Sequence, residues 1–143
     1  MTIEALPNMK EGTFAMKKLL AILIALAMFV SFLPIQANAA EITASGTCGD
    51  HATWTLDNAG VLTIAGTGDM HYYWSDDVCP WEEWSSEITK VVVEEGITEI
   101  GSCAFKEFSN LTGITLPDSL ETIGYEAIML CKKLTEIEIP ENV

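Results

Sequence analysis

The sequence predicts a mainly β solenoid with 23-residue repeats and short helical turns, preceded by a β-hairpin cap. Three observations support this fold class. The chain matches itself when it is shifted by 23 residues, each matching unit holds a short alternation of apolar and polar residues, and a hairpin pattern stands before the first unit. We divide the chain into a signal peptide at residues 1–39, a β cap segment at residues 40–87 and repeats at residues 88–143. Residues 1–15 lie upstream of a second good start at Met16, so we expect them to be an extended gene start with no structural role.

The first element is a secretory signal peptide. Lys17 and Lys18 precede residues 19–33, which are apolar apart from one serine, and Pro34 ends this run before an Ala-Asn-Ala-Ala sequence whose third residue is Ala39. A charged start, an apolar run too short to span a bilayer and small residues before the cleavage point are the features that export requires. We therefore expect cleavage after Ala39 and a secreted or cell-surface chain with no membrane span after cleavage.

The composition excludes several classes of partner. The chain has 21 acidic residues against seven lysines and no arginine, and its formal net charge is -14 at pH 7. Such a charge repels phosphate backbones, and the sequence has no basic cluster that would attract DNA, RNA or an anionic membrane surface. We expect neither nucleic acid nor lipid headgroups as partners.

The repeats consist of a half-unit followed by two units. Residues 97–105 match residues 120–128, and residues 111–118 match residues 134–141. Residues 88–96 stand 23 positions before the segment that begins at residue 111, and they keep the three apolar positions of that segment. An apolar register that is kept through three strands is typical of a solenoid, in which each repeat contacts only its neighbours.

Each unit has one apolar side that must be covered. Ile114 and Leu116 are expected to face inward from a short strand, while Thr115 between them faces outward. Gly101 and Gly124 allow the chain to turn before a short helical or irregular return segment. Burial of one such aliphatic side chain contributes about 1.5–3 kcal/mol, but a single coil cannot cover its own apolar side, so the units are expected to stack.

The segment before the repeats reads as a hairpin and a loop rich in aromatic residues. Alternating residues at 54–56 and 61–64 flank a turn at 57–60 that contains Asp, Asn and Gly. This hairpin is expected to cap the first repeat strand, whose inward residues would otherwise face water. The loop that follows contains Tyr72, Tyr73, Trp74, Trp81 and Trp84, which we expect to pack the cap onto the first coil, with a sugar-stacking platform as the alternative.

The repeat pattern Ile-Gly-x-x-Ala-Phe, followed by Leu-Thr-x-Ile-x-Leu-Pro, resembles the BspA-type leucine-rich repeat of bacterial surface proteins. The resemblance covers residues 88–143, and residues 46–81 are similar to the segment that often opens such proteins. Two departures, Phe108 in place of the usual Cys and Ile128 in place of the usual Phe, are conservative changes in the expected core. The resemblance implies a leucine-rich-repeat solenoid, adhesion to or binding of host or microbial partners, and no common enzymatic activity.

Cys48 and Cys79 have two possible roles in this sequence, a disulfide or a zinc site. Export exposes them to oxidising conditions, so we expect a disulfide between Cys48 and Cys79 that ties the hairpin to the aromatic loop. The alternative is zinc held by these two cysteines with His51 and His71, although the spacing is unlike that of familiar zinc fingers. We expect no resident metal, cofactor or catalytic residue, because the adjacent carboxylates at 76–77 and 82–83 are typical of a solvated surface.

The outward residues of the three repeat strands form the candidate partner-binding face. In the predicted register they make two short rows, Lys90 with Gly113 and Glu136, and Val92 with Thr115 and Glu138. Their small and acidic side chains suit a polar or basic protein partner, and a merely solvated sheet face is the alternative. We also expect the chain to be part of a longer array, because Ile137 and Ile139 have no following coil in the sequence.

Two function classes follow from these features. The first is a non-catalytic scaffold on the cell surface or in the medium that binds a protein partner or mediates adhesion through the strand face. The alternative is a carbohydrate-binding module that uses the aromatic side chains of the cap segment.

Overall fold

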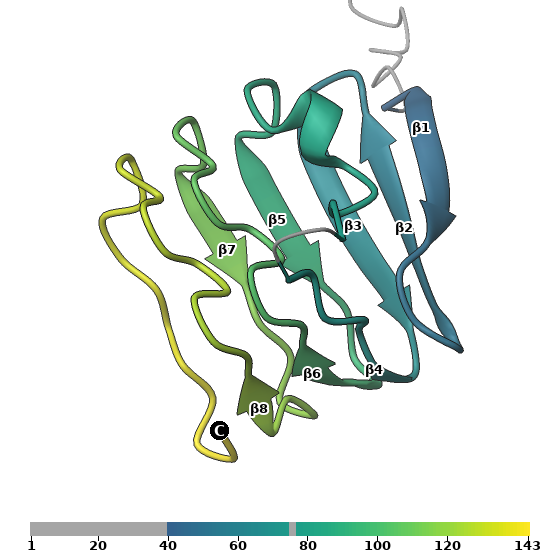
Figure 1. The fold of residues 1–143 in the computed structure, drawn as a ribbon, viewed down its shortest axis with the longest axis vertical. Helices are drawn as coiled ribbons and strands as arrows, with labels where there is room; N and C mark the ends of the chain where they lie inside the picture. The colour runs from purple at the N-terminus through teal and green to yellow at the C-terminus, as the bar shows by residue number, and fades with distance from the viewer. Residues whose placement is uncertain (1–39, 75–76) are drawn as a thin grey trace, which may run out of the picture. The chain divides into compact units, whose positions relative to one another are not determined.

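The computed structural model describes residues 40–74 and 77–143, so the predicted signal peptide lies outside the described residues. Side chains that alternate between buried and exposed build a five-stranded sheet. Its strand order is β1-β2-β3-β5-β7, in which β1, β2 and β3 are antiparallel neighbours and β3, β5 and β7 run parallel (Figure 1). The bounds are β1 Ile42–Thr47, β2 Ala52–Asp57, β3 Val61–Gly66, β5 Lys90–Val93 and β7 Gly113–Thr115.

A second sheet contains three short parallel strands. They are β4 (Gly68–Asp69), β6 (Ile97–Ile100) and β8 (Thr122–Ile123), and each follows a strand of the larger sheet in sequence. Within the described residues the only helix is the 3-10 helix η1 (Glu82–Trp84). The prediction of a mainly β chain is therefore confirmed.

Two of the parallel strand pairs, β5 with β7 and β6 with β8, join residues that are 23 positions apart. Lys90 lies opposite Gly113 in the larger sheet, and Glu99 lies opposite Thr122 in the smaller one. The return segments are joined at a similar interval, because the backbone N–H of Phe105 donates to the carbonyl oxygen of Ala127 at 2.8 Å. Successive units thus pair one another's backbone N–H and carbonyl groups in the larger sheet, in the smaller sheet and in the return segments.

The turn between β2 and β3 follows from its residue types. The Asp57 carboxylate accepts hydrogen bonds from the backbone N–H groups of Ala59 and Val61, both at 2.9 Å. Gly60 has a φ of 76°, which glycine adopts without a steric cost. These local contacts fix the antiparallel register of β2 on β3.

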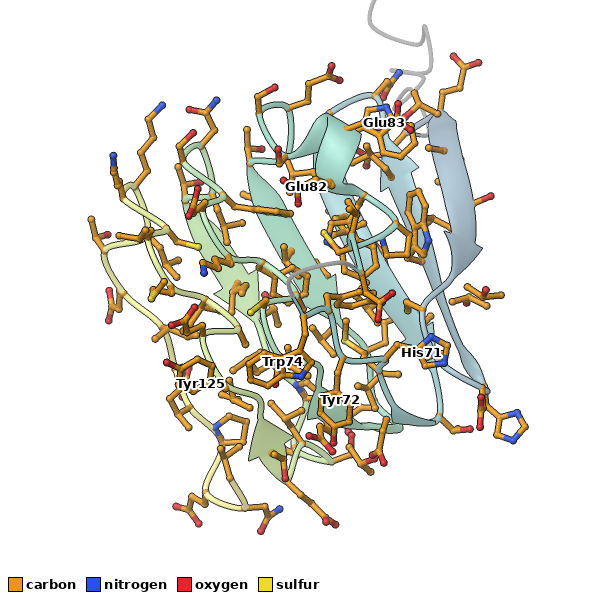
Figure 2. All side chains as sticks on the ribbon, in the orientation of Figure 1. His71, Tyr72, Trp74, Glu82, Glu83 and Tyr125 are labelled. Carbon is orange, nitrogen blue, oxygen red and sulfur yellow. The ribbon has the colours of Figure 1, made fainter. Side chains whose placement is uncertain are left out.

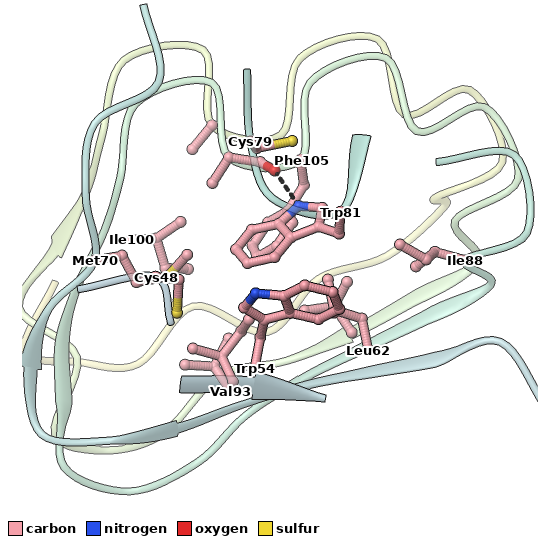
Figure 3. Packing of buried hydrophobic residues seen from close by; sticks show 14 of the residues in the cluster. Cys48, Trp54, Leu62, Met70, Cys79, Trp81, Ile88, Val93, Ile100 and Phe105 are labelled. Atoms are coloured by element: carbon pink, nitrogen blue, oxygen red, sulfur yellow. Dashed lines mark hydrogen bonds between the residues drawn. The ribbon is translucent and has the colours of Figure 1, made fainter. Parts of the chain in front are cut away.

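A buried aromatic cluster joins the cap segment to the first repeat. Trp81 is fully buried, and its ring centroid lies 5.8 Å from those of Trp54, Tyr73 and Phe105. Figure 3 shows Trp81 beside Trp54 and Phe105. The indole N–H of Trp81 donates to the carbonyl oxygen of Ala104 at 2.9 Å. The indole ring is therefore both an apolar anchor and a hydrogen-bonded link between segments 23 residues apart.

The two departures from the repeat pattern fit the core. Phe108 is fully buried and makes an edge contact with Phe105, with centroids 6.0 Å apart. Ile128 is half-buried and packs against the core. Cys131 is half-buried, and its thiol donates to the carbonyl oxygen of Phe105 at 3.1 Å.

Candidate functional site

The outer face of the five-stranded sheet is made by residues that alternate with the buried ones. Val91 is buried and lies opposite Ile114, whereas the next residue, Val92, is half-exposed and lies opposite the exposed Thr115. The side chains on the outer face therefore do not contribute to the core between the sheets, and they can change without disturbing it.

The outer face extends further than the three repeat strands. A continuous row crosses all five strands through the paired residues Ser45, Thr55, Thr63, Val92 and Thr115. Sequence reasoning missed the first three members because it treated the hairpin only as a cap. The available signal was the polar residue between apolar neighbours in residues 54–56 and 62–64.

A second, shorter row contains Lys90, the charged residue of the predicted face that the structure places in a paired strand. Val61 lies opposite Lys90, which in turn lies opposite Gly113. A Cβ atom at Gly113 would meet no atom within 4 Å, so the surface is open at this point. The exposed Lys90 ammonium and the neighbouring hydroxyl row offer hydrogen-bond donors and acceptors but no nucleophile paired with a base.

The structure does not place Glu136 and Glu138 in the ladder. Residues 132–139 form no strand, so neither glutamate pairs with β7. Both side chains are exposed, and Glu138 lines a hollow of about 680 Å³ together with Thr115. Ile139 is 46% exposed, so the inward row that would anchor a strand here is incompletely covered.

The disulfide between Cys48 and Cys79 is not present in the structure. Both residues are free thiols, 0% and 5% exposed, and Figure 3 shows their sulfur atoms apart within the core. Burial raises the pKa of Cys48 to about 12. Burial, together with a hydrogen bond to Glu82, raises the pKa of Cys79 to about 12 as well. Each thiol behaves as a small apolar side chain.

The alternative zinc ligands are not assembled either. His51 and His71 are exposed, whereas Cys48 and Cys79 are buried. Within residues 40–74 and 77–143, no group of three or more potential metal ligands is found.

The aromatic side chains of the cap segment divide into two groups. Trp81 and Tyr73 are buried, and Trp84 is half-buried with its ring 5.7 Å from that of Trp54, so none of these rings forms an open platform. Their role is packing, because the fold covers their faces with other aromatic rings. Tyr72 and Trp74 are each 52% exposed (Figure 2).

The fold and the face define a class of protein. Short parallel strands that pair at an interval of 23 residues, with little helix in the return segments, are the architecture of a leucine-rich repeat protein. No helix in the described part of the chain is both long enough and apolar enough to cross a membrane.

The comparisons with known proteins match the repeat segment of the chain. Residues 83–143 match the family described as "BspA type Leucine rich repeat region (6 copies)". The fold is similar to that of a leucine-rich repeat protein from Eubacterium ventriosum, with a TM-score of 0.54 and 36% sequence identity over 59% of this chain. This chain spans 23% of the length of that protein. The comparison with curated proteins gives no match. Residues 83–143 therefore carry repeats similar to the BspA-type leucine-rich repeat.

Proposed function

We propose that this chain is a non-catalytic scaffold of a secreted or cell-surface protein and that it binds a protein partner through the outer face of the five-stranded sheet. The observation that carries the proposal is the continuous row from Ser45 to Thr115, which is polar at four of its five positions. Repeat proteins commonly present such a face as one extended binding surface. The match of residues 83–143 to a leucine-rich repeat family also supports an interaction role.

The proposal includes the architecture that produces the face. The units stack as a solenoid of 23-residue repeats, and the hairpin of β2 and β3 caps its first coil. The parallel pairing of β3 with β5 supports this, because Leu62 and Val91 are paired and both fully or almost fully buried. β3 pairs with the edge of β5, the first repeat strand, and adds Thr63 to the outer face.

A crosslinking experiment tests the face. A photoreactive residue placed at Thr63 or Thr115 in the whole chain is expected to capture a protein partner from host or bacterial extracts. The matched control carries the same group at Glu83, which is exposed on η1 and outside the sheet (Figure 2). Equal capture from all three positions would show that the contact is not specific to the face.

Substitutions at Thr115 and at the two exposed glutamates that follow the sheet in sequence provide a second measurement. Thr115→Lys and the Glu136→Gln, Glu138→Gln pair are expected to weaken capture of that partner, while Glu83→Gln leaves it unchanged. All four positions are exposed, so circular dichroism should report an unaltered fold. Unchanged capture by the face variants would remove the sheet face as the site.

Export is the second part of the proposal. It is supported by the signal-like pattern that ends at Ala39. Mass spectrometry of the protein recovered from the medium or cell surface of a bacterial host should give Ala40 as the first residue. Recovery of the chain only inside the cell, with its leader intact, would contradict export.

A further inference from the structure

A hollow of about 860 Å³ is lined by β4, by the loop that follows it and by residues 50–51 between β1 and β2. Its lining combines aromatic and acidic side chains and shares no residue with the outer face of the five-stranded sheet. The residues that matter for its chemistry are Asp50, Asp69, Tyr72, Trp74 and Asp77.

One wall of the hollow is an aromatic side chain that the fold holds in place. Trp74 is 52% exposed and stacks on Tyr125, with centroids 5.6 Å apart and an angle of 13° between the rings (Figure 2). Tyr125 is 63% exposed and comes from the second repeat, so the stack joins the loop to a distant segment. Tyr72 is fixed as well, because its O–H donates to a Glu99 carboxylate oxygen at 2.9 Å. Two ordered rings at a hollow form an exposed apolar surface of the kind that marks binding sites.

The other walls are acidic and incompletely neutralised. Asp50 lies 3.7 Å from the imidazole of His71, and Asp69 accepts a hydrogen bond from the Thr98 hydroxyl at 2.7 Å. Among the described residues no lysine lines the hollow, and the sequence contains no arginine. In a protein with a net charge of -14, carboxylates around a concave surface concentrate a negative potential there.

Lys106 lines an adjoining hollow together with Trp74 and Asp77, but its charge is already paired. Lys106 pairs with Glu126 at 2.7 Å, next to the ring of Tyr125. The hydrogen bond to Lys106 holds the pKa of Glu126 below its usual range, which keeps that carboxylate ionised. The cation that complements the hollow must therefore come from another molecule.

We propose that this hollow binds an arginine or lysine side chain of a protein partner, with the cation against the Trp74 ring and paired with Asp69 and Asp77. An aromatic face attracts a cation, and nearby carboxylates strengthen that attraction. A neutral sugar would use the ring but would leave the charge of the three aspartates uncompensated. The site is a second surface, additional to the sheet face, and it does not depend on that proposal.

Binding of a defined peptide to the whole chain tests this site. The probe is a short glycine-flanked arginine peptide, and its control contains citrulline, which has the same shape without the charge. Isothermal titration calorimetry is expected to show saturable binding of the arginine peptide and at least about tenfold weaker binding of the citrulline peptide. Binding of the arginine peptide should also weaken as salt is raised.

Variants locate the peptide. Trp74→Ala is expected to weaken binding by about three- to tenfold, and Asp77→Asn by about two- to fivefold. Tyr125→Phe should leave binding unchanged because it keeps the stacked ring, whereas Tyr125→Ala should weaken it. Glu83→Gln removes one exposed carboxylate elsewhere and should have no effect.

Three results would overturn the site. They are equal affinity for the arginine and citrulline peptides, an unchanged affinity in Trp74→Ala, or binding of an oligosaccharide such as cellohexaose that Trp74→Ala abolishes while the arginine peptide does not bind. The test is separate from that of the sheet face. Thr115→Lys addresses only the sheet face, and a failure there would leave peptide binding at the hollow intact.

Discussion

Replacement of Trp81 by phenylalanine and by alanine tests whether the aromatic loop is chiefly a structural anchor. Trp81 is fully buried between rings of the hairpin, the loop and the first repeat, and its N–H donates to the Ala104 carbonyl oxygen. Phenylalanine keeps a ring in the cluster but leaves that carbonyl without its donor. Alanine removes both the ring and the donor.

The magnitudes follow from these contacts. An unpaired buried carbonyl and a smaller ring should cost about 2 kcal/mol in Trp81→Phe. Loss of the whole buried side chain should cost about 4 kcal/mol in Trp81→Ala, within the range found for large-to-small core changes. A domain of this size unfolds with about 5–15 kcal/mol, so the alanine variant should be marginally stable. The exposed Trp74 offers the matched control, since Trp74→Ala should cost about 0.5 kcal/mol.

Urea unfolding followed by circular dichroism measures the three variants. With a urea dependence of about 1.5 kcal/mol per molar, the midpoint should fall by about 1.3 M in Trp81→Phe, about 2.7 M in Trp81→Ala and less than about 0.4 M in Trp74→Ala. Equal midpoints for Trp81→Ala and the unaltered chain would refute the claim that this ring anchors the cap segment.

Further predictions concern backbone contacts and ionisation. Gly101→Ala places a Cβ atom against a backbone carbonyl oxygen and should lower the urea midpoint by at least about 1 M, whereas Gly113→Ala meets open space and should change it little. Because burial raises the folded-state pKa of Cys48 and Cys79 from 9.0 to about 12, their contribution to the free energy of unfolding is complete below pH 9 and is lost as pH rises toward 12. Unfolding curves measured from pH 8 to pH 11 should therefore show falling stability, and a flat profile would contradict the burial of both thiols. Leu130 has a φ of 62°, so Leu130→Gly should raise the midpoint slightly, and a clear decrease would argue against strain at this turn.

The repeat interval and the strand positions were accessible from local patterns. Alternation in residues 88–93 and 111–116 identifies an inward and an outward side, because successive side chains of a strand point to opposite faces. The Asp57 to Gly60 turn was readable for a similar reason, since these residue types form the turn through their own side chains and backbone. Family resemblance rested on the same short-range spacing, and the comparisons agree with it.

The candidate site was predicted only in part. Lys90, Val92, Gly113 and Thr115 lie in paired strands as expected, whereas Glu136 and Glu138 lie outside any strand. A further strand would pair with β7 only if its inward side chains were covered. The outward residues Glu136 and Glu138 carry no information about that cover.

Local patterns were enough to predict a mainly β chain with alternating faces, and residues 83–143 match the BspA-type leucine-rich repeat. The tertiary structure alone decided that β3 joins β5 in parallel and extends the face to five strands, that Cys48 and Cys79 are separate buried thiols, and that Trp74 stacks on Tyr125 beside an acidic hollow. The difference lies in the sequence separation over which each feature is encoded. A repeat interval and a strand alternation are encoded within a few residues, but these three features depend on which distant segments share one core and which side chains that core leaves exposed to water.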